Sequence, residues 1–503
     1  MHRMPRRASS RREVIAVIDV GSNSGRVVVF ENDAAGHLRT LAGARASLRL
    51  VHDVDTRGEL SDATMGRAME AIRDFKAIAT GAGARRIIAI ATAAMRDAGN
   101  GALFAERLRR ELGIRIEIID GAVEAQYGFT GGVRGLAVSS GLLFDVGGGS
   151  MQLTRFTRRA RRSDVSLPFG ALRLSEQFLE SDPPTRKQLQ RLREHVRHQL
   201  AKAGVKRLAA GERLVGTGGT LRNLAKIDRQ ARHYPIVGLH GYELPVDRLK
   251  EVVDLLAATK EKRRDQLPGL SAERADSIVG GAVAIQTLAE FVRAKDILVS
   301  GQGVREGLAL GLLGIPFGLP EDVRETSLSS LVSRFDGWLP DAAARRRHVA
   351  ATLYRAIEPR GPAAVRMAVE QAAGILDIGR SLDVVNRHQH VADIVLTTEL
   401  NGFTHAELAL LSAIVRRAGD RNADILPLAV AGEFDEPLVE RGAVILSLAD
   451  EIEARCPRGK PIAIHAKLDR NVTLSIPVLP SWLAKGVDKR FERAFGRSLI
   501  VRH

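Results

Sequence analysis

The sequence has few of the residues that mark several protein classes. Its single cysteine, Cys456, excludes an intramolecular disulfide and a cysteine-based zinc site. Aromatic residues make up only 4 % of the chain, which argues against nucleic acid as a partner because unpaired bases are held by aromatic stacking. No apolar run reaches about 18 residues, so the sequence predicts no transmembrane helix and no membrane partner. We therefore expect a protein of the reducing cytoplasm.

Acidic residues are too few to balance the basic ones, and the net charge is +16. Such a surplus implies an anionic partner, although a GC-rich genome, which favours arginine over lysine, would also produce it. A polyanion without bases agrees with both the charge and the scarcity of aromatic residues. Residues 1–12 are basic, are followed by no long apolar segment, and predict a disordered arm rather than a secretion signal.

The chain of 503 residues is long enough for about three or four domains. Strands and helices alternate over its first part, which predicts an α/β fold. The expected strands cover 14–20, 25–31, 85–92 and 114–120, and an expected helix covers 101–112. The prolines and glycines of "GIPFGLPED" (314–322) predict a domain boundary. Beyond it we expect mostly helices, then a hairpin within 460–478 and a closing helix from about Pro480.

Two segments of the α/β region resemble each other. When "IDVGSNSGRVVVF" from Ile18 is set against "FDVGGGSMQLTRF" from Phe144, Asp19 falls on Asp145. Gly21 then falls on Gly147 and Ser24 on Ser150. Each segment starts at the end of an apolar strand and leads into another strand. The repeat predicts two similar lobes, each of which offers an aspartate and a polar turn to a shared cleft.

Glycine-rich turns of this kind favour phosphate binding. Glycine has no Cβ, so its backbone can approach a ligand closely, and successive N–H groups form an anion-binding concavity. A helix that follows the turn adds positive potential. Tight turns without a ligand are the alternative interpretation. The predicted phosphate-binding residues are Ser22, Asn23, Ser24, Gly147, Gly148, Gly149, Ser150, Gly218, Gly219 and Thr220.

The two aspartates cannot hold phosphate directly because like charges repel. A divalent cation between carboxylate and phosphate oxygens resolves the conflict, and Mg²⁺ is usually held by one or two carboxylates together with phosphate and water. The same ion screens the charge that develops in phosphoryl transfer. We therefore predict that Asp145, with Asp19, binds Mg²⁺.

Five segments in order resemble the exopolyphosphatase / guanosine pentaphosphate phosphohydrolase (Ppx/GppA) family of the actin–Hsp70–sugar kinase superfamily. They are "VIDVGSNSGRVVVF", "ATAAMRDAGN", "IIDGAVEAQYGF", "LLFDVGGGSMQL" and "LVGTGGTLRNLA". The resemblance is strong over residues 13–312. It implies two actin-like, ribonuclease-H-like lobes with a cleft for the end of a phosphate chain. It also implies Mg²⁺-dependent release of terminal orthophosphate, a monovalent cation such as K⁺ as a further cofactor, and a homodimer.

The same resemblance assigns roles to two further residues. The segment "DGAVEA" (120–125) matches a family segment that usually reads S-G-x-E-E-A, so Glu124 lies at the catalytic position. Its implied role is to orient or deprotonate the attacking water, and it joins the predicted metal ligands. Arg96 lies at the family's arginine position and would grip phosphate oxygens. Without the resemblance, Glu124 reads as a surface residue of a helix, and Arg96 as the partner of Asp97.

This sequence departs from the family pattern at several points. Val123 replaces the first glutamate of the pair, and Gln152 stands where G-G-G-S-x-E has a glutamate. The long family members carry a helical domain that resembles an HD domain, but its His-Asp pair would fall on Leu376 and Asp377. The predicted metal site there is therefore degenerate. The nearby His388 and His390 are expected to be structural or exposed.

The predicted domains follow from these observations. They are lobe I over 13–130, lobe II over 131–313, a helical HD-like domain over 321–430 and a small α+β module over 431–503.

A long polyphosphate chain needs a basic track outside the cleft. Arg158, Arg159, Arg161 and Arg162 are the predicted track, because they follow the second phosphate turn at the tip of an expected hairpin. The basic stretches 260–264 and 344–348 are further candidates. A solvated surface is the alternative for each.

The sequence thus predicts a processive exopolyphosphatase whose partner is inorganic polyphosphate. Guanosine pentaphosphate hydrolysis, within the same family, is the closest alternative. An ATP-dependent actin-like filament or chaperone is a second alternative, against which the Glu124 and Arg96 motifs argue. A non-catalytic sensor of polyphosphate or alarmones is the third, because the exchanges at Val123 and Gln152 leave activity open.

Overall fold

The computed structural model describes residues 13–432, 435–480, 482, 484 and 486–502, so the predicted basic arm lies outside the described residues. The chain forms two compact units. The first unit consists of two segments, the chain up to His233 and Leu239–Thr326. The second consists of the short segment Tyr234–Gly238 and the chain from Ser327 onward. Within the described residues, no helix has both the length and the apolar character needed to cross a membrane.

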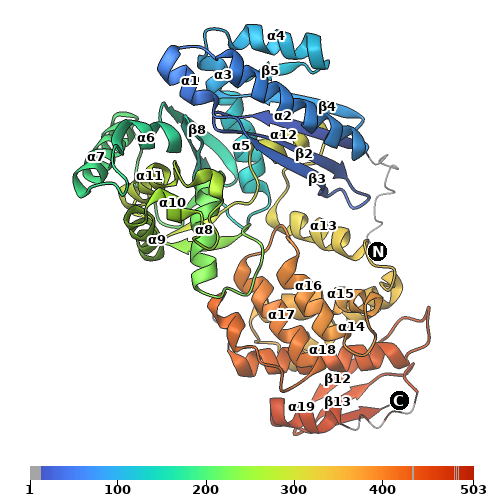
Figure 1. Cartoon of the computed structure of the whole chain (residues 1–503). Coiled ribbons are helices and arrows are strands. Elements are labelled where there is room, and N and C mark those ends of the chain that lie inside the picture. The colour runs from blue at the N-terminus through green and yellow to red at the C-terminus, as the bar shows by residue number, and fades with distance from the viewer. Residues whose placement is uncertain (1–12, 433–434, 481, 483, 485, 503) are drawn as a thin grey trace. The chain divides into compact units, whose positions relative to one another are not determined.

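The first sheet of the first unit has the order β3-β2-β1-β4-β5 (Figure 1). Its strands are β1 (Val14–Val20), β2 (Ser24–Asn32), β3 (Leu38–Ser47), β4 (Arg86–Ala91) and β5 (Ile116–Ile118). The first three strands are antiparallel, whereas β4 runs parallel to β1 and β5 parallel to β4. The apolar residues of β1 from Ile15 onward are buried, as expected of a strand covered on both faces.

The second sheet repeats this arrangement. Its order is β10-β11-β9-β6-β7-β8. Its strands are β6 (Gly141–Val146), β7 (Met151–Thr157), β8 (Ala160–Leu167), β9 (Arg213–Thr217), β10 (Tyr242–Pro245) and β11 (Asp296–Val299). Three antiparallel strands are again followed by two parallel ones, and β10 is an additional edge strand. The structure therefore contains the two similar sheets that the internal repeat predicts.

Helices surround both sheets. In the first unit they are α1 (Leu50–Arg57), α2 (Asp62–Gly81), α3 (Ala93–Asp97), α4 (Gly101–Leu112), α5 (Gly121–Arg134), α6 (Ala171–Phe178), α7 (Arg186–Lys202), α8 (Gly219–Ala231), α9 (Val246–Ala258), α10 (Glu261–Arg264), the short η1 (Ala272–Arg274), α11 (Ile278–Phe291) and α12 (Val304–Leu312); α13 (Pro320–Val332) follows. Leu308 and Ala309 of α12 pack with Ile15 and Val17 of β1. The sequence prediction assigned α12 to lobe II (131–313), but this helix packs against the first sheet.

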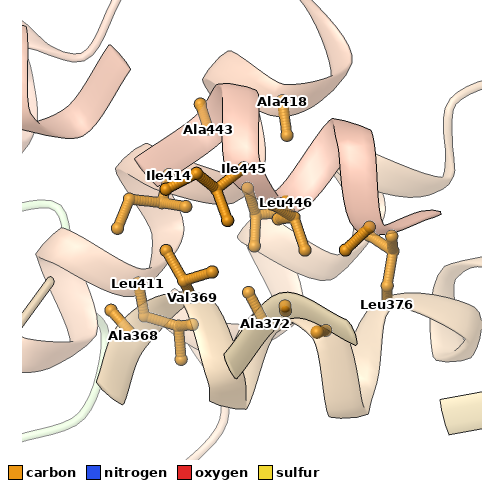
Figure 2. Packing of buried hydrophobic residues seen from close by; sticks show 14 of the residues in the cluster. Ala368, Val369, Ala372, Leu376, Leu411, Ile414, Ala418, Ala443, Ile445 and Leu446 are labelled. Carbon is orange, nitrogen blue, oxygen red and sulfur yellow. The ribbon is translucent and has the colours of Figure 1, made fainter. Parts of the chain in front are cut away.

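The second unit is mostly helical. Its helices are α14 (Pro340–Ile357), α15 (Ala363–Ile375), η2 (Leu376–Ser381), α16 (Arg387–Thr397), α17 (His405–Gly419), η3 (Leu426–Val430), α18 (Glu436–Arg455) and α19 (Val487–Phe495). Figure 2 shows α15, α17 and α18 packing through residues such as Val369, Ile414 and Leu446. Because α18 packs in the centre of this core, its residues belong with the helices and not with a separate end module.

A small sheet lies at the end of the chain. It comprises β12 (His465–Leu468), β13 (Val472–Ser475) and β14 (Leu499–Arg502). The expected hairpin within 460–478 is confirmed by the antiparallel pairing of β12 and β13. The expected closing helix is wrong in extent, because α19 starts only at Val487 and is followed by β14, which pairs parallel to β13. Leu474 and Phe491 of this region join the hydrophobic core of the helices.

Candidate active site

A cavity of about 130 Å³ in the first unit collects the strand ends and turns of both sheets. Asp19 comes from β1 and Asp145 from the corresponding position of β6, and both line this cavity. The turns that follow the two strands touch: a Cβ on Gly148 would lie 3.1 Å from the Cβ of Asn23. The two related segments therefore meet, as expected from a repeat whose halves face each other.

Most of the predicted phosphate-binding residues line the cavity. These are Ser22, Asn23, Ser24, Gly147, Gly148, Ser150, Gly218 and Gly219. Two lie beside it instead: the carbonyl of Gly149 accepts a hydrogen bond from Arg173 (3.1 Å), and Thr220 is fully buried. Gly218 has φ of +94°, and a Cβ there would lie 2.4 Å from Oδ1 of Asp145. Only glycine can bring this backbone so close to the carboxylate.

Glu124 reaches the same cavity from the first turn of α5. The side chain of Asp120 caps this helix by accepting hydrogen bonds from the backbone N–H groups of Ala122 and Val123 (2.9 and 2.8 Å). The Glu124 side chain is 13 % exposed, and its buried Oε2 has no hydrogen-bond partner. Burial, and then the carboxylates of Asp145 and Asp19, raise the pKa of Glu124 to about 8. A carboxyl with this pKa can accept or give a proton near neutral pH.

Burial also raises the pKa of the two aspartates. Arg305 and Arg26 oppose this rise for Asp19, and Arg222 opposes it for Asp145. Three carboxyl groups whose pKa is raised by burial therefore face one small cavity, and this arrangement favours a cationic ligand.

Arg96, on α3, lies next to Glu124. Its Nη1 donates a hydrogen bond to the carbonyl of Ile119 (2.9 Å) and lies 3.7 Å from Oε2 of Glu124. Its Nε lies 3.9 Å from Oδ1 of Asp97. Arg96 is not among the cavity-lining residues. The structure thus places it where it can orient Glu124, and its contact with phosphate stays a prediction.

Four arginines that line the cavity were not predicted from the sequence: Arg26, Arg222, Arg274 and Arg305. Three of them carried a usable signal, because each follows a glycine-rich turn by a few residues, in "GSNSGR", "GTGGTLR" and "GQGVR". Arg274 belongs to the short η1, follows none of the glycine-rich turns in the sequence, and carried no such signal.

These four guanidinium groups have few partners. Arg222 donates to the carbonyl of Gly301 (3.1 Å), and Arg305 comes no closer than 3.9 Å to Asp19. The Nε atoms of Arg274 and Arg305 are buried without a hydrogen-bond partner. Burial, followed by neighbouring arginines, lowers the pKa of Arg26 to about 9 and that of Arg274 to about 10. Buried and poorly paired cations are costly, so this wall of the cavity suits a polyanion.

The two departures from the family pattern have different surroundings. Gln152 pairs with Asp145 across β6 and β7, lines the cavity, and its Nε2 donates to Oγ of Ser150 (2.8 Å). It therefore remains a polar member of the site. Val123 packs with the apolar cluster of β1 and α12. The glutamate missing at this position is thus replaced by a packing residue.

Of the predicted track residues, Arg158 and Arg159 lie in the turn between β7 and β8, as expected of a hairpin tip, whereas Arg161 and Arg162 belong to the start of β8. The guanidinium of Arg159, however, donates to the carbonyls of Arg134, Leu136 and Val138. It also lies 4.6 Å from the ring centre of Phe317. Burial lowers the pKa of Arg159 to about 10. This side chain supports the fold, which leaves Arg158, Arg161 and Arg162 exposed at or beside the tip.

The two other basic stretches each contain a buried arginine. Arg264 is 4 % exposed and donates to the carbonyls of Thr259 (2.8 Å) and Ala275 (2.8 Å). Arg346 is fully buried in the second unit and bonds Asp377 (2.6 Å). Neither residue fits a surface track or the solvated face that was its alternative, because both guanidinium groups are buried.

The carboxylates of the cavity suit a Mg²⁺ ion whose remaining ligands are phosphate oxygens and water. Across the described residues, no three or more histidine, cysteine, aspartate or glutamate side chains are arranged to hold a metal by themselves. Mg²⁺, however, needs only one or two carboxylates when phosphate oxygens and water complete its shell. Asp19, Asp145 and the unpartnered Oε2 of Glu124 offer such a set. The donors suit an ion that binds together with phosphate.

The second unit does not fit a metal at the expected HD position. Asp377 accepts from Arg346 and forms an ion pair with Arg380 (2.8 Å). Guanidinium groups thus take the place a cation would need. Burial lowers the pKa of His388 to about 4, so this histidine is neutral at physiological pH.

Known proteins resemble the first unit. The profile of the Ppx/GppA phosphatase family matches residues 28–315. Exopolyphosphatase 1 of Mycobacterium leprae is 31 % identical over 301 residues, which cover 59 % of this chain and 88 % of that protein. Exopolyphosphatase 2 of Mycobacterium tuberculosis is 30 % identical over 315 residues, or 60 % of this chain and 98 % of that protein.

Solved structures agree with these matches. The crystal structure of an exopolyphosphatase from Cytophaga hutchinsonii has a TM-score of 0.56 and 25 % identity, and the match covers 61 % of this chain and 100 % of that one. The Aquifex aeolicus Ppx/GppA family member has a TM-score of 0.53 and 27 % identity, with coverage of 60 % and 98 %.

Proposed function

The chain belongs to the Ppx/GppA phosphatase family, and from this we propose that it is an exopolyphosphatase that hydrolyses the terminal phosphate of inorganic polyphosphate and releases orthophosphate. One observation carries the proposal. The cavity sets three carboxyl groups against four poorly paired arginines. The carboxyl groups suit a metal ion and an attacking water, and the arginines suit a chain of phosphates.

In the proposed reaction, Glu124 accepts the proton of the attacking water. Its raised pKa and its unpartnered Oε2 support this role, and Arg96 at 3.7 Å holds the carboxylate in place. Asp145 and Asp19 would hold Mg²⁺, which neutralises charge on the phosphoryl oxygens when bound. The backbone N–H groups of the glycine turns and the arginines would position the end of the chain for in-line attack.

The lining of the cavity favours inorganic polyphosphate over guanosine pentaphosphate. Among the described residues that line it, none is aromatic, and Val146 and Val304 are the large apolar ones. A guanine base would therefore find no ring to stack on inside the cavity. Hydrolysis of guanosine pentaphosphate is the second candidate, because a base that stays outside the cavity would not meet this obstacle.

The proposal extends to five further properties of the protein, each with its own test. They are dependence on Mg²⁺, stimulation by K⁺, processive hydrolysis, a cytoplasmic location and a homodimer.

The experiment is phosphate release from long-chain polyphosphate and from guanosine pentaphosphate, with Mg²⁺ or with EDTA, by the wild type and by Glu124→Ala. We expect faster release from polyphosphate, and loss of release with EDTA and in the variant. Faster release from the guanosine substrate would move the function to the second candidate. No release from either substrate, with polyphosphate still bound, would replace the enzyme by a polyphosphate sensor.

A further inference from the structure

Three basic residues follow one face of α8. Arg222, Lys226 and Arg229 are spaced i, i+4 and i+7, so they lie above one another on the helix surface. Arg222 lines the cavity, Lys226 is exposed and Arg229 is half-exposed. At 1.5 Å per residue the face extends over about 10 Å. It therefore leads from the cavity to the surface.

The outer two cations have no anionic partner. Within the described part of the chain, the side chains of Lys226 and Arg229 make no hydrogen bond and no ion pair. On another face of the same helix, Asp228 is fully buried and bonds Arg248 (2.9 Å). The helix thus pairs its charges where it packs and leaves them unpaired beside the cavity. Like charges at i and i+4 destabilise a helix, so the pattern indicates an anionic ligand.

Arginines of the first sheet lie near this face of α8. Arg26 on β2 also lines the cavity, and Arg45 on β3 forms an ion pair with Glu273 (2.8 Å). Burial, and then Arg222, Arg229, Arg26 and Arg45, lower the pKa of Lys226. The cations of α8 and of the first sheet are therefore close enough to act on one another. Beyond Arg222, the residues of α8 that reach solvent are Lys226, Arg229, Gln230 and Ala231, which offer no ring for a base.

We propose that the Arg222–Lys226–Arg229 face of α8 binds the polyphosphate chain where it leaves the catalytic cavity. The inference rests on the proposed function and names the substrate-binding surface beyond the cavity. It locates the track on α8 instead of at the hairpin tip, where Arg159 is committed to the fold. The ligand is an inorganic phosphate chain of several units, because the face offers charge and no stacking surface.

The test compares two double variants that remove the same charge. Lys226→Glu/Arg229→Glu changes the proposed track, whereas Arg191→Glu/Lys202→Glu changes two exposed basic residues of α7. For the α8 variant we expect KM for long-chain polyphosphate to rise at least about ten-fold, and KM for tripolyphosphate to change far less. The slope of log KM against log salt should fall by roughly one unit for each lost contact. The α7 variant should behave as the wild type does.

The outcomes separate this inference from the proposed function. Equal effects of the α8 and α7 variants on long chains would overturn the track and leave the enzyme intact. An equal rise in KM for tripolyphosphate and for long chains would also overturn the track, because the two residues would then act inside the cavity. A wild type inactive on polyphosphate would instead overturn the proposed function. If the α8 variant does not fold, Lys226→Gln/Arg229→Gln gives the same comparison, with a smaller expected rise in KM.

Discussion

The two units both bury arginines beside carboxylates, but they space these charges differently. In the second unit, Arg346 lies 2.6 Å from Asp377 and 2.9 Å from Asp450, so its charge is closely paired. In the cavity of the first unit, Arg305 comes only within 3.9 Å of Asp19, and Arg96, half-buried beside the cavity, lies 3.7 Å from Glu124. Close pairing supports a fold, whereas buried charge without close partners is available to a ligand.

The largest effect on stability is expected from Arg346→Ala. The variant removes the more deeply buried of the two arginines that Asp377 and Asp450 share, and leaves only Arg387 in contact with both. We therefore expect a loss of about 3 kcal/mol in the free energy of unfolding. Chemical denaturation, followed through the unfolding transition of the second unit, measures this free energy. The matched control is Arg366→Ala, which removes an exposed arginine of α15 and should cost less than about 0.5 kcal/mol. Similar values for both variants would show that the Arg346 network does not support the fold.

The spacing of the cavity charges is tested by Gly218→Ala. Its Cβ would lie 2.4 Å from Oδ1 of Asp145, so the carboxylate must move. We expect activity to fall about 100-fold, as misplacement by about 1 Å can cause. Gly211→Ala is the control, because Gly211 has a similar φ of +79° but no atom within 4 Å of the added Cβ. If Gly211→Ala loses as much activity as Gly218→Ala, backbone strain at a positive φ explains the loss, and displacement of the Asp145 carboxylate does not.

A smaller effect is expected in the pH dependence of stability. The pKa of Glu124 is about 8 in the folded protein against an ordinary value of 4.5, so the folded state retains a proton that the unfolded state releases. Stability from this group is present at low pH and is lost as pH rises from about 4.5 to about 8. Without metal, the unfolding free energy of the wild type, relative to Glu124→Gln, should therefore decrease over this window. Parallel curves for the two proteins would contradict the raised pKa.

The smallest effects concern the hairpin tip. Arg159→Ala removes three hydrogen bonds to carbonyls, and we expect it to lower the free energy of unfolding by about 1–2 kcal/mol. Arg162→Ala removes an exposed arginine and should leave stability unchanged within about 0.5 kcal/mol. We expect neither variant to raise KM for long-chain polyphosphate. A rise with Arg162→Ala would restore the hairpin tip as the track.

The sequence alone predicted the elements that depend on local pattern. The apolar runs of β1 and β6, each ended by an aspartate and a polar turn, are visible in the sequence, and their likeness predicted two similar sheets and a shared cleft. The resemblance to a family added Glu124, which no local pattern marks.

What depended on contacts between distant segments could not be predicted. Arg274 enters the cavity from η1, and α12 returns to pack against β1. Burial of Arg264 and Arg346 was equally hidden, because a basic stretch has the same composition at the surface and inside a network. The extent of α19 was missed because the strand β14 behind it pairs with a strand that precedes it in the chain.

The central claim is that the unpaired charges of the cavity serve catalysis and not stability. The most direct measurement takes phosphate release from polyphosphate and the free energy of unfolding on the same Glu124→Ala protein, at about pH 8, where roughly half of this carboxyl is ionised. We expect release to fall by about 100-fold or more, with stability equal to or above that of the wild type, because a buried carboxyl without a hydrogen-bond partner is removed. Retained release, or release lost only because the variant unfolds, would contradict the account.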